Sequence, residues 1–201
     1  MNATPTMLRR EARRRHVILA ASEVFGNRGY HGTSMDEVSV RAGFTKPMLY
    51  ELFSGKLELY LTVLQSHIDA LVRGVRHALA SGDNHQRVHA AVQAIFDFAD
   101  EDPAGLRLIF ESGVSNEPSV EWRVRNAIAE CVGCISDAVI DDSGLDPHRA
   151  RLLAVGLVGA SQMAAREWLD SGRPITKRAA VEITVALCWD GLSRVPLHSD
   201  D

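Results

Sequence analysis

Two side chains, Tyr50 and Lys56, are placed to bind an anion. Lys56 opens a predicted helix, and a cation in the first turn of a helix is unfavourable because partial positive charge of the helix dipole already lies there. A phosphate beside Lys56 would remove this conflict, since helix N-terminal N–H groups and a lysine together bind phosphate. Tyr50, in the segment just before, can donate its hydroxyl to the same phosphate backbone. An ordinary solvated lysine is the equally weighted alternative.

Local signals predict two short helices before Lys56. Residues 34–37, Ser-Met-Asp-Glu, have the S-x-x-E form of a capping box, so a helix is expected to begin at Met35. Gly43 ends it. Thr45 is a favourable N-cap for the next helix, and Pro47 fits the first turn, where its missing N–H does little damage. The three-residue connection suits a helix-turn-helix, and it suits an ordinary antiparallel helix pair as well.

Apolar residues recur at helical spacing along the whole chain, and we find no run that alternates like a strand, so an all-α fold is predicted. A first helix should start within the arginine cluster of residues 9–15 and end at Gly29. Its apolar face is formed by Val17, Ala21, Val24 and Phe25. Further helices are predicted from Lys56 to near Gly82 and at about 84–101, 104–112, 119–141, 147–170 and 176–194, with a break at Ser112–Pro118 and a cap at Thr176.

The composition is that of an ordinary soluble protein. The 201 residues are 46% hydrophobic and 24% charged, and no apolar run approaches the ~18 residues of a membrane span. The arginine-rich start has no apolar signal core behind it, so we expect a cytoplasmic protein with no membrane partner.

Charge is distributed unevenly along the chain. Residues 1–60 contain nine Lys or Arg against six Asp or Glu, whereas the remainder contains thirteen against twenty, for a formal net charge of -4. This asymmetry is typical of a basic DNA-reading end attached to an acidic body, and a solvated face can also produce it.

The cysteines offer a second candidate chemistry. Cys131 and Cys134 form a C-x-x-C, but they lie on a predicted helix without a second Cys or His pair, which favours core packing over a metal or redox site. Cys188 makes the number odd, so reduced thiols are expected. We find no catalytic cluster, metal-ligand set or cofactor motif and expect no enzyme activity. The alternative class is an α-helical small-molecule-binding enzyme or thiol-redox protein.

Residues 17–60 resemble the N-terminal signature of the TetR family of bacterial repressors. The resemblance is carried by Phe25-Gly26-Asn27-Arg28-Gly29-Tyr30, Thr33-Ser34-Met35, Arg41-Ala42-Gly43-Phe44-Thr45-Lys46, Leu49-Tyr50, Phe53 and Lys56. It implies a helix-turn-helix DNA-binding domain at 1–54 and a helical ligand-binding and dimerisation domain at 55–201.

The same resemblance implies a set of DNA-binding residues: Met35, Thr45, Lys46, Pro47, Met48, Tyr50 and Lys56. Thr45, Tyr50 and Lys56 would contact phosphates, Lys46 a phosphate or base edge, and Met48 a base or thymine methyl. Met35 would offer only its N–H. The sequence departs from the family pattern at Met48, Glu51 and Leu52. Glu51 is expected to face solvent, with a cytosine N4 as the alternative partner.

The C-terminal part has two predicted roles. Gly156, Gly159 and Ala160 would allow two helices to approach closely, and the resemblance implies a homodimer through about 147–170 and 176–194. Close packing within one chain is the alternative. Candidates to line an apolar cavity for a hydrophobic effector are Phe96, Phe110, Trp122, Met163 and Trp168, although each is individually more typical of ordinary core.

These observations together predict a homodimeric repressor that binds a palindromic operator in double-stranded DNA and is released by a small hydrophobic effector. The arginine cluster of residues 9–15 has two alternative roles. It could contact DNA phosphates or a minor groove, or it could be a solvated helix start.

Overall fold

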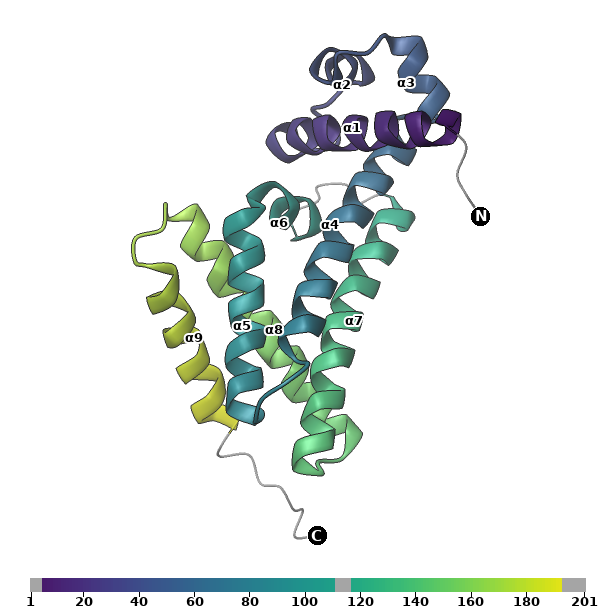
Figure 1. Cartoon of the computed structure of the whole chain (residues 1–201). Helices are drawn as coiled ribbons and strands as arrows, with labels where there is room; N and C mark the ends of the chain where they lie inside the picture. Colours follow the sequence, from purple (N-terminus) through teal and green to yellow (C-terminus); the bar gives the residue numbers. More distant parts are fainter. Residues whose placement is uncertain (1–4, 111–116, 193–201) are drawn as a thin grey trace. The chain divides into compact units, whose positions relative to one another are not determined.

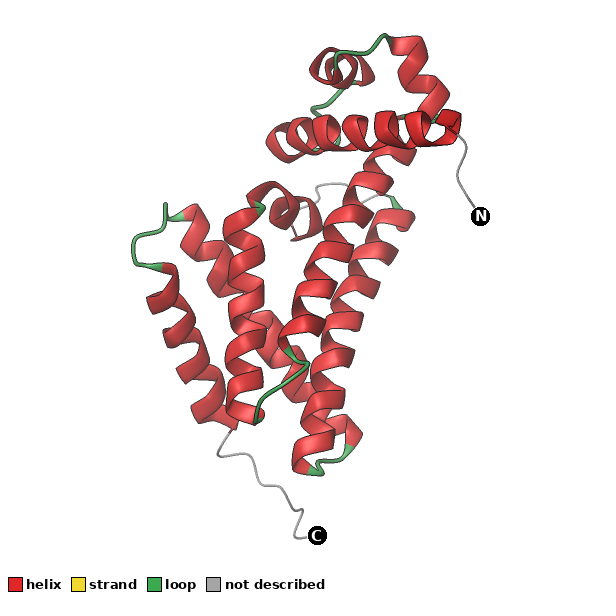
Figure 2. Ribbon diagram, viewed as in Figure 1, coloured by secondary structure: helices red, strands yellow, loops and turns green. Residues whose placement is uncertain are grey.

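The computed structural model describes residues 5–110 and 117–192, and over these ranges it contains nine helices and no strand (Figure 2). Their bounds (Figure 1) are α1 Pro5–Arg28, α2 Met35–Ala42, α3 Lys46–Leu52, α4 Lys56–Ala78, α5 Asn84–Glu101, α6 Pro103–Phe110, α7 Pro118–Ser143, α8 Pro147–Asp170 and α9 Lys177–Leu192. The all-α prediction is confirmed. None of the described helices has the length and hydropathy that a membrane span requires.

Helix α1 begins earlier than predicted, at Pro5 rather than inside the arginine cluster. Proline suits a first helical residue, because its fixed φ is helical and no N–H partner is needed there. The helix ends where expected, at Gly29, whose φ of 68° is a left-handed conformation that glycine adopts without strain. Val17 and Phe25 are buried as predicted, whereas Val24 is only partly covered.

Helix α4 ends earlier than expected, at Ala78 rather than near Gly82. Helix α6 is described as far as Phe110, the last described residue before the gap, so its predicted end at about 112 lies outside the described residues. Most of the predicted break at Ser112–Pro118 lies outside the described residues, as do the last two residues of the predicted 176–194 helix.

The helices form two compact units. The first comprises the described residues within 1–68 and 104–124, and the second comprises those within 69–103 and 125–201. The division between the two units falls inside α4 and α7.

An aromatic cluster forms the centre of the first unit. The Tyr60 ring of α4 meets Phe25 edge-on at a centroid distance of 5.1 Å and Tyr30 at 5.0 Å. Helix α6 packs closely against α1 at Gly26, because a Cβ added to this glycine would lie only 2.4 Å from the Cβ of Ala104 in α6. The glycine is therefore a packing requirement.

The second unit is built on contacts among α5, α8 and α9. The Phe96 and Trp168 rings lie 5.9 Å apart between α5 and α8. At the surface, Lys177 at the start of α9 joins α5 through Asp97 at 2.7 Å and Asp100 at 3.1 Å. These contacts fix the α8–α9 pair on α5.

Candidate DNA-binding interface

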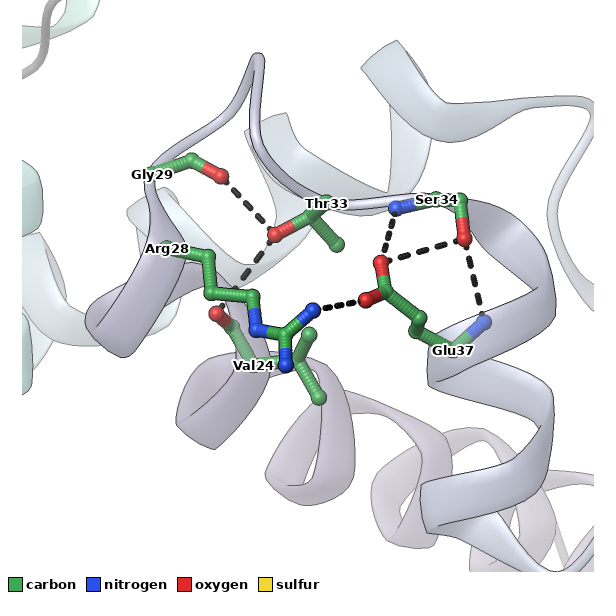
Figure 3. Close-up of polar contacts among 6 residues, drawn as sticks. All are labelled: Val24, Arg28, Gly29, Thr33, Ser34 and Glu37. Atoms are coloured by element: carbon green, nitrogen blue, oxygen red, sulfur yellow. Dashed lines mark hydrogen bonds and ion pairs between the residues drawn. The ribbon is translucent and has the colours of Figure 1, made fainter.

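The start of α2 is fixed by the predicted capping box (Figure 3). Ser34 Oγ accepts the Glu37 N–H at 3.2 Å, and the Glu37 carboxylate accepts the Ser34 N–H at 2.8 Å. Arg28 at the end of α1 forms an ion pair with the same carboxylate, and the Thr33 hydroxyl donates to the Gly29 carbonyl at 2.8 Å. The hydrogen bond from the Ser34 backbone is the main reason that the pKa of Glu37 is lowered. The end of α1 thus orients α2.

The connection between α2 and α3 is held from α1. Gly43 has a φ of 67°, and the Phe44 N–H donates back to the Ser39 carbonyl at 3.0 Å, which closes the C-terminal end of α2. His16 of α1 donates to the Ala42 carbonyl at 3.0 Å, and its ring meets Phe44 edge-on. The turn is therefore fixed on both sides.

Helix α3 buries one face and exposes the other. Leu49 and the following Phe53 are fully buried, whereas Tyr50 is exposed and Met48 is partly covered. The first residues, 45–47, are also exposed. Thr45 occupies the N-cap position, but its hydroxyl makes no capping hydrogen bond and can serve another partner.

Lys46 forms an ion pair within the chain in the absence of DNA. Its Nζ lies 2.9 Å from Asp36 Oδ1 of α2, and hydrogen bonding to Asp36 is the main cause of its raised pKa. This pair was not anticipated from the sequence. The expected contact of Lys46 with a phosphate or base edge would require this ion pair to open.

Lys56 is the first residue of α4, as predicted, but its charge has a partner that the sequence did not reveal. The Nζ lies 4.4 Å from the centroid of the Tyr30 ring, an arrangement typical of a cation–π contact. Burial is the main reason that the pKa of the Tyr30 hydroxyl is raised. The unfavourable cation at the helix start is thus offset by an aromatic face.

Met35 differs from the other candidates because its side chain is only 7% exposed and packs in the core. The side chain of Met35 is therefore not available at the surface, and the backbone N–H at the start of α2 stays the only group of this residue predicted to reach DNA. Glu51 is exposed to solvent, which is the orientation favoured from sequence.

The five predicted effector residues have different surroundings. Phe96 and Trp168 pack against each other as core of the second unit, and Trp168 Nε1 donates to the Ile175 carbonyl at 2.8 Å. Met163 is 59% exposed on α8. Phe110 and Trp122 belong to the first unit, where Trp122 is 63% exposed. Apolar residue type identified these side chains, and it does not distinguish core from surface.

An open groove lies between α4 and α5 in the second unit. It has a volume of about 390 Å³. Its lining includes Gly74, His77, Ala90, Gln93 and Phe98, and none of the five predicted effector residues takes part. Small side chains on both helices keep the groove open, a signal that a search for aromatic residues overlooks.

The C-x-x-C residues lie in the body of α7. Cys131 is buried, and burial raises its pKa to about 12, so it is a thiol at neutral pH. Cys134 is partly exposed. Among the described residues, no group of three His, Cys, Asp or Glu side chains is arranged to hold a metal ion.

Two short helices joined by a glycine turn, with the second helix exposing hydroxyl and cationic groups, define a helix-turn-helix DNA-binding protein. Residues 17–63 match the family model described as bacterial regulatory proteins, tetR family. The chain is 53% identical over 197 residues to the HTH-type transcriptional activator FasR of Mycolicibacterium smegmatis, covering 98% of this chain and 90% of the relative. The chain therefore belongs to the TetR family and is a DNA-binding transcriptional regulator.

Other similarities extend over most of the chain. The HTH-type transcriptional regulator BetI of Escherichia coli O157:H7 is 25% identical over 186 residues, covering 90% of this chain and 94% of the relative. Among solved structures, a TetR-like regulator from Rhodococcus sp. RHA1 has a TM-score of 0.77 at 22% identity and covers 96% of this chain and 100% of its own. FadR from Bacillus subtilis in complex with stearoyl-CoA has a TM-score of 0.75 at 14% identity, covering 88% and 98%. These structures confirm the fold.

Proposed function

We propose that this chain is a dimeric transcriptional activator that reads DNA with α3 and holds the DNA backbone with Thr45, Tyr50 and Lys56. The observation that carries the proposal is the exposed surface formed by residues 45–47 and Tyr50, with the partly covered Lys56 at the start of α4, on a helix whose opposite face is buried through Leu49. A buried face fixes the helix, and the exposed groups are those that contact phosphates in protein–DNA interfaces.

The direction of regulation is proposed from the relatives. Repression is the expectation that the family resemblance carries from sequence. The relative with 53% identity is named a transcriptional activator, and its similarity covers 98% of this chain. That relation favours activation over repression.

The proposed dimer forms through α8 and α9. Large apolar side chains stand exposed on these two helices: Leu152, Val155, Met163, Ile183 and Leu187. Gly156 and Gly159 lie in the same region of α8, and a Cβ at either would meet nothing within 4 Å in the single chain. Close packing within the chain therefore does not account for these glycines, whereas the approach of a second copy does.

The proposed effector is a small hydrophobic molecule bound in the second unit. The similar fold of FadR, whose structure contains stearoyl-CoA, supports an effector of this kind. The groove between α4 and α5 offers an opening lined largely by small and apolar residues. An effector changes DNA binding only if it binds the DNA-competent and incompetent states with different affinity.

The DNA interface is tested with duplexes recovered from genomic DNA by the purified protein. Tyr50→Phe and Lys56→Ala should weaken binding on selected and scrambled duplexes alike, and Lys56→Ala should lower the salt slope by about 1. Met48→Ala should change the preferred sequence. DNA binding unaltered by all three variants would refute the assignment.

The direction and the effector need separate measurements. Deletion of the gene should lower expression from a promoter whose DNA the protein selects, and increased expression would establish repression instead. A panel of fatty acids and acyl-CoA molecules should give a thermal shift and alter DNA affinity. A panel without either effect would contradict a hydrophobic effector of this class.

A further inference from the structure

The arginines at the start of α1 differ in their contacts. Arg14 is fully engaged: it donates to the Leu52 carbonyl at 2.7 Å, its guanidinium lies 4.2 Å from the Phe53 ring centroid, and it lies 3.7 Å from the Glu58 carboxylate. The side chains of Arg9, Arg10, Arg13 and Arg15 are exposed and, within the described residues, form no hydrogen bond or ion pair.

Cations elsewhere in the helix-turn-helix have carboxylate partners. Arg28 pairs with Glu37, Arg41 with Glu23 and Lys46 with Asp36. The uncompensated positive charge of this region is therefore concentrated at the start of α1.

This concentration is unfavourable in the free chain. Arg9 and Arg13 are four residues apart, a spacing at which like charges repel by a few tenths of a kcal/mol. The nearby Glu11 is one acid among five arginines. A polyanion bound along this end of the helix would offset this repulsion.

The helical spacing places three of the free arginines on one face. Arg10 is one turn before Arg14, and Arg13 is one turn before the buried Val17, while Arg9 is one turn before Arg13. Arg15 follows Arg13 by two residues and so lies on the opposite side of α1. The face of Arg9, Arg10 and Arg13 continues the face by which α1 packs on the rest of the first unit.

Arg14 also fixes where this face lies. Its contacts to Leu52 and Phe53 attach the N-terminal half of α1 to the end of α3, and Figure 1 shows this end of α1 beside the junction of α3 and α4. Tyr50 and Lys56, the proposed phosphate contacts, flank that same junction.

We infer that Arg9, Arg10 and Arg13 form a second phosphate-binding surface, which extends the DNA contact of the helix-turn-helix along the backbone of double-stranded DNA. The inference rests on the proposed DNA interface. Contacts of guanidinium groups with phosphates are independent of base sequence and release counterions, so they raise affinity and salt dependence together.

The test compares the full-length chain with Arg9→Ala/Arg10→Ala/Arg13→Ala, using a duplex selected from genomic DNA and a scrambled duplex of the same length. The triple variant should bind both duplexes more weakly by a similar factor, about tenfold or more. Its slope of log affinity against log salt should decrease by about 0.9 for each phosphate that the variant no longer neutralises. Arg15→Ala is the matched control and should retain the wild-type slope.

A second variant separates charge from folding. Arg9→Lys/Arg10→Lys/Arg13→Lys keeps the charge and should retain most of the salt slope, with circular dichroism reporting whether α1 remains helical. A triple alanine variant that keeps the wild-type slope, while Lys56→Ala lowers it, would overturn this inference and leave the helix-turn-helix interface standing. Unchanged DNA binding with abolished activation would also overturn it, in favour of an acidic protein partner. A wild-type chain that bound neither duplex would refute the proposed function itself.

Discussion

The α2–α3 region and the α8–α9 pair are both exposed helix pairs, and they differ in how their surfaces are satisfied. Around α2 and α3, the capping box and the Lys46–Asp36 ion pair give polar groups partners within the chain. On α8 and α9, large side chains such as Leu187 are exposed to solvent. The polar groups of the first surface have partners within the single chain, and under the proposed function Lys46 would exchange its partner when DNA binds. The second is apolar and needs another apolar surface to cover it.

Glycines show the same difference. Gly26 has no room for a methyl group, because Ala104 of the same unit already occupies the space. Gly156 faces open space. A glycine required by packing within the chain can therefore be distinguished from one whose packing partner lies outside it, and substitutions on the two surfaces should differ accordingly.

The largest effect is expected from Leu187→Asp on α9. Leu187 is 70% exposed in the single chain, and burial of a leucine contributes about 1.5–3 kcal/mol in each copy of a symmetric dimer. Dissociation should become about a hundredfold more favourable or greater, measured by analytical ultracentrifugation over a range of concentrations. Val40→Asp is the control, because Val40 is 81% exposed on α2 in the first unit. Equal dimer stability in the two variants would contradict the α8–α9 interface.

Next comes the pair Gly26→Ala and Gly156→Ala. Gly26→Ala should lower the free energy of unfolding by about 1–3 kcal/mol, because overpacking forces the neighbouring helix to move. Gly156→Ala should leave it unchanged or raise it by about 0.5–1 kcal/mol, since alanine is the better helix former. Urea unfolding in a Leu187→Asp background keeps dimerisation out of the measurement. A decrease in stability for Gly156→Ala comparable to that of Gly26→Ala would show that its space is filled within the chain.

A smaller effect is expected for Asp36→Asn. The substitution releases Lys46 and removes a negative charge close to the proposed phosphate contacts, so DNA affinity should rise by about two- to fivefold. Asp137→Asn changes the net charge equally in the second unit and should have little effect. Titration of a selected duplex at fixed salt measures both. Affinity that falls in Asp36→Asn would mean that the ion pair is needed to orient α3.

The smallest expected effect is on the stability of the fold at acidic pH. Because the pKa of Glu37 is lowered from 4.5, its stabilising contribution is present above that value and is lost as the pH falls through the lower folded-state pKa. Glu37→Gln should therefore show a weaker loss of stability than wild type on acidification, measured by urea unfolding from neutral pH to below the ordinary glutamate value. Parallel pH profiles would exclude Glu37 as a contributor.

The sequence predicted the helices where local chemistry decides their ends. Ser34, Gly43 and Thr176 each act through backbone groups a few residues away, and the structure places a cap or stop at each. The start of α1 was missed because Pro5 is compatible with a helix start without requiring one, and the arginine cluster beyond it obscured the boundary.

The site was predicted less completely, because some partners are distant in the chain. Lys56 was identified as a misplaced cation, but the Tyr30 ring that receives it becomes its neighbour only after folding. Arg14 could not be told from Arg13 by type, since only contact with Leu52 and Phe53 distinguishes them. Trp122 was assigned to a cavity by hydrophobicity, which is equally compatible with an exposed position.

A helix surface on which glycines allow another helix to approach closely also discriminates between partners. In the proposed dimer, a partner helix could come near enough at Gly156 and Gly159 for backbones to touch, provided that it too presents small residues at the facing positions. A paralogous regulator with leucine there would be held away, and its exposed aliphatic groups would remain partly solvated. In a cell that contains several regulators of this fold, the two glycines would restrict the chain to its own kind and keep two identical DNA-reading heads in each dimer.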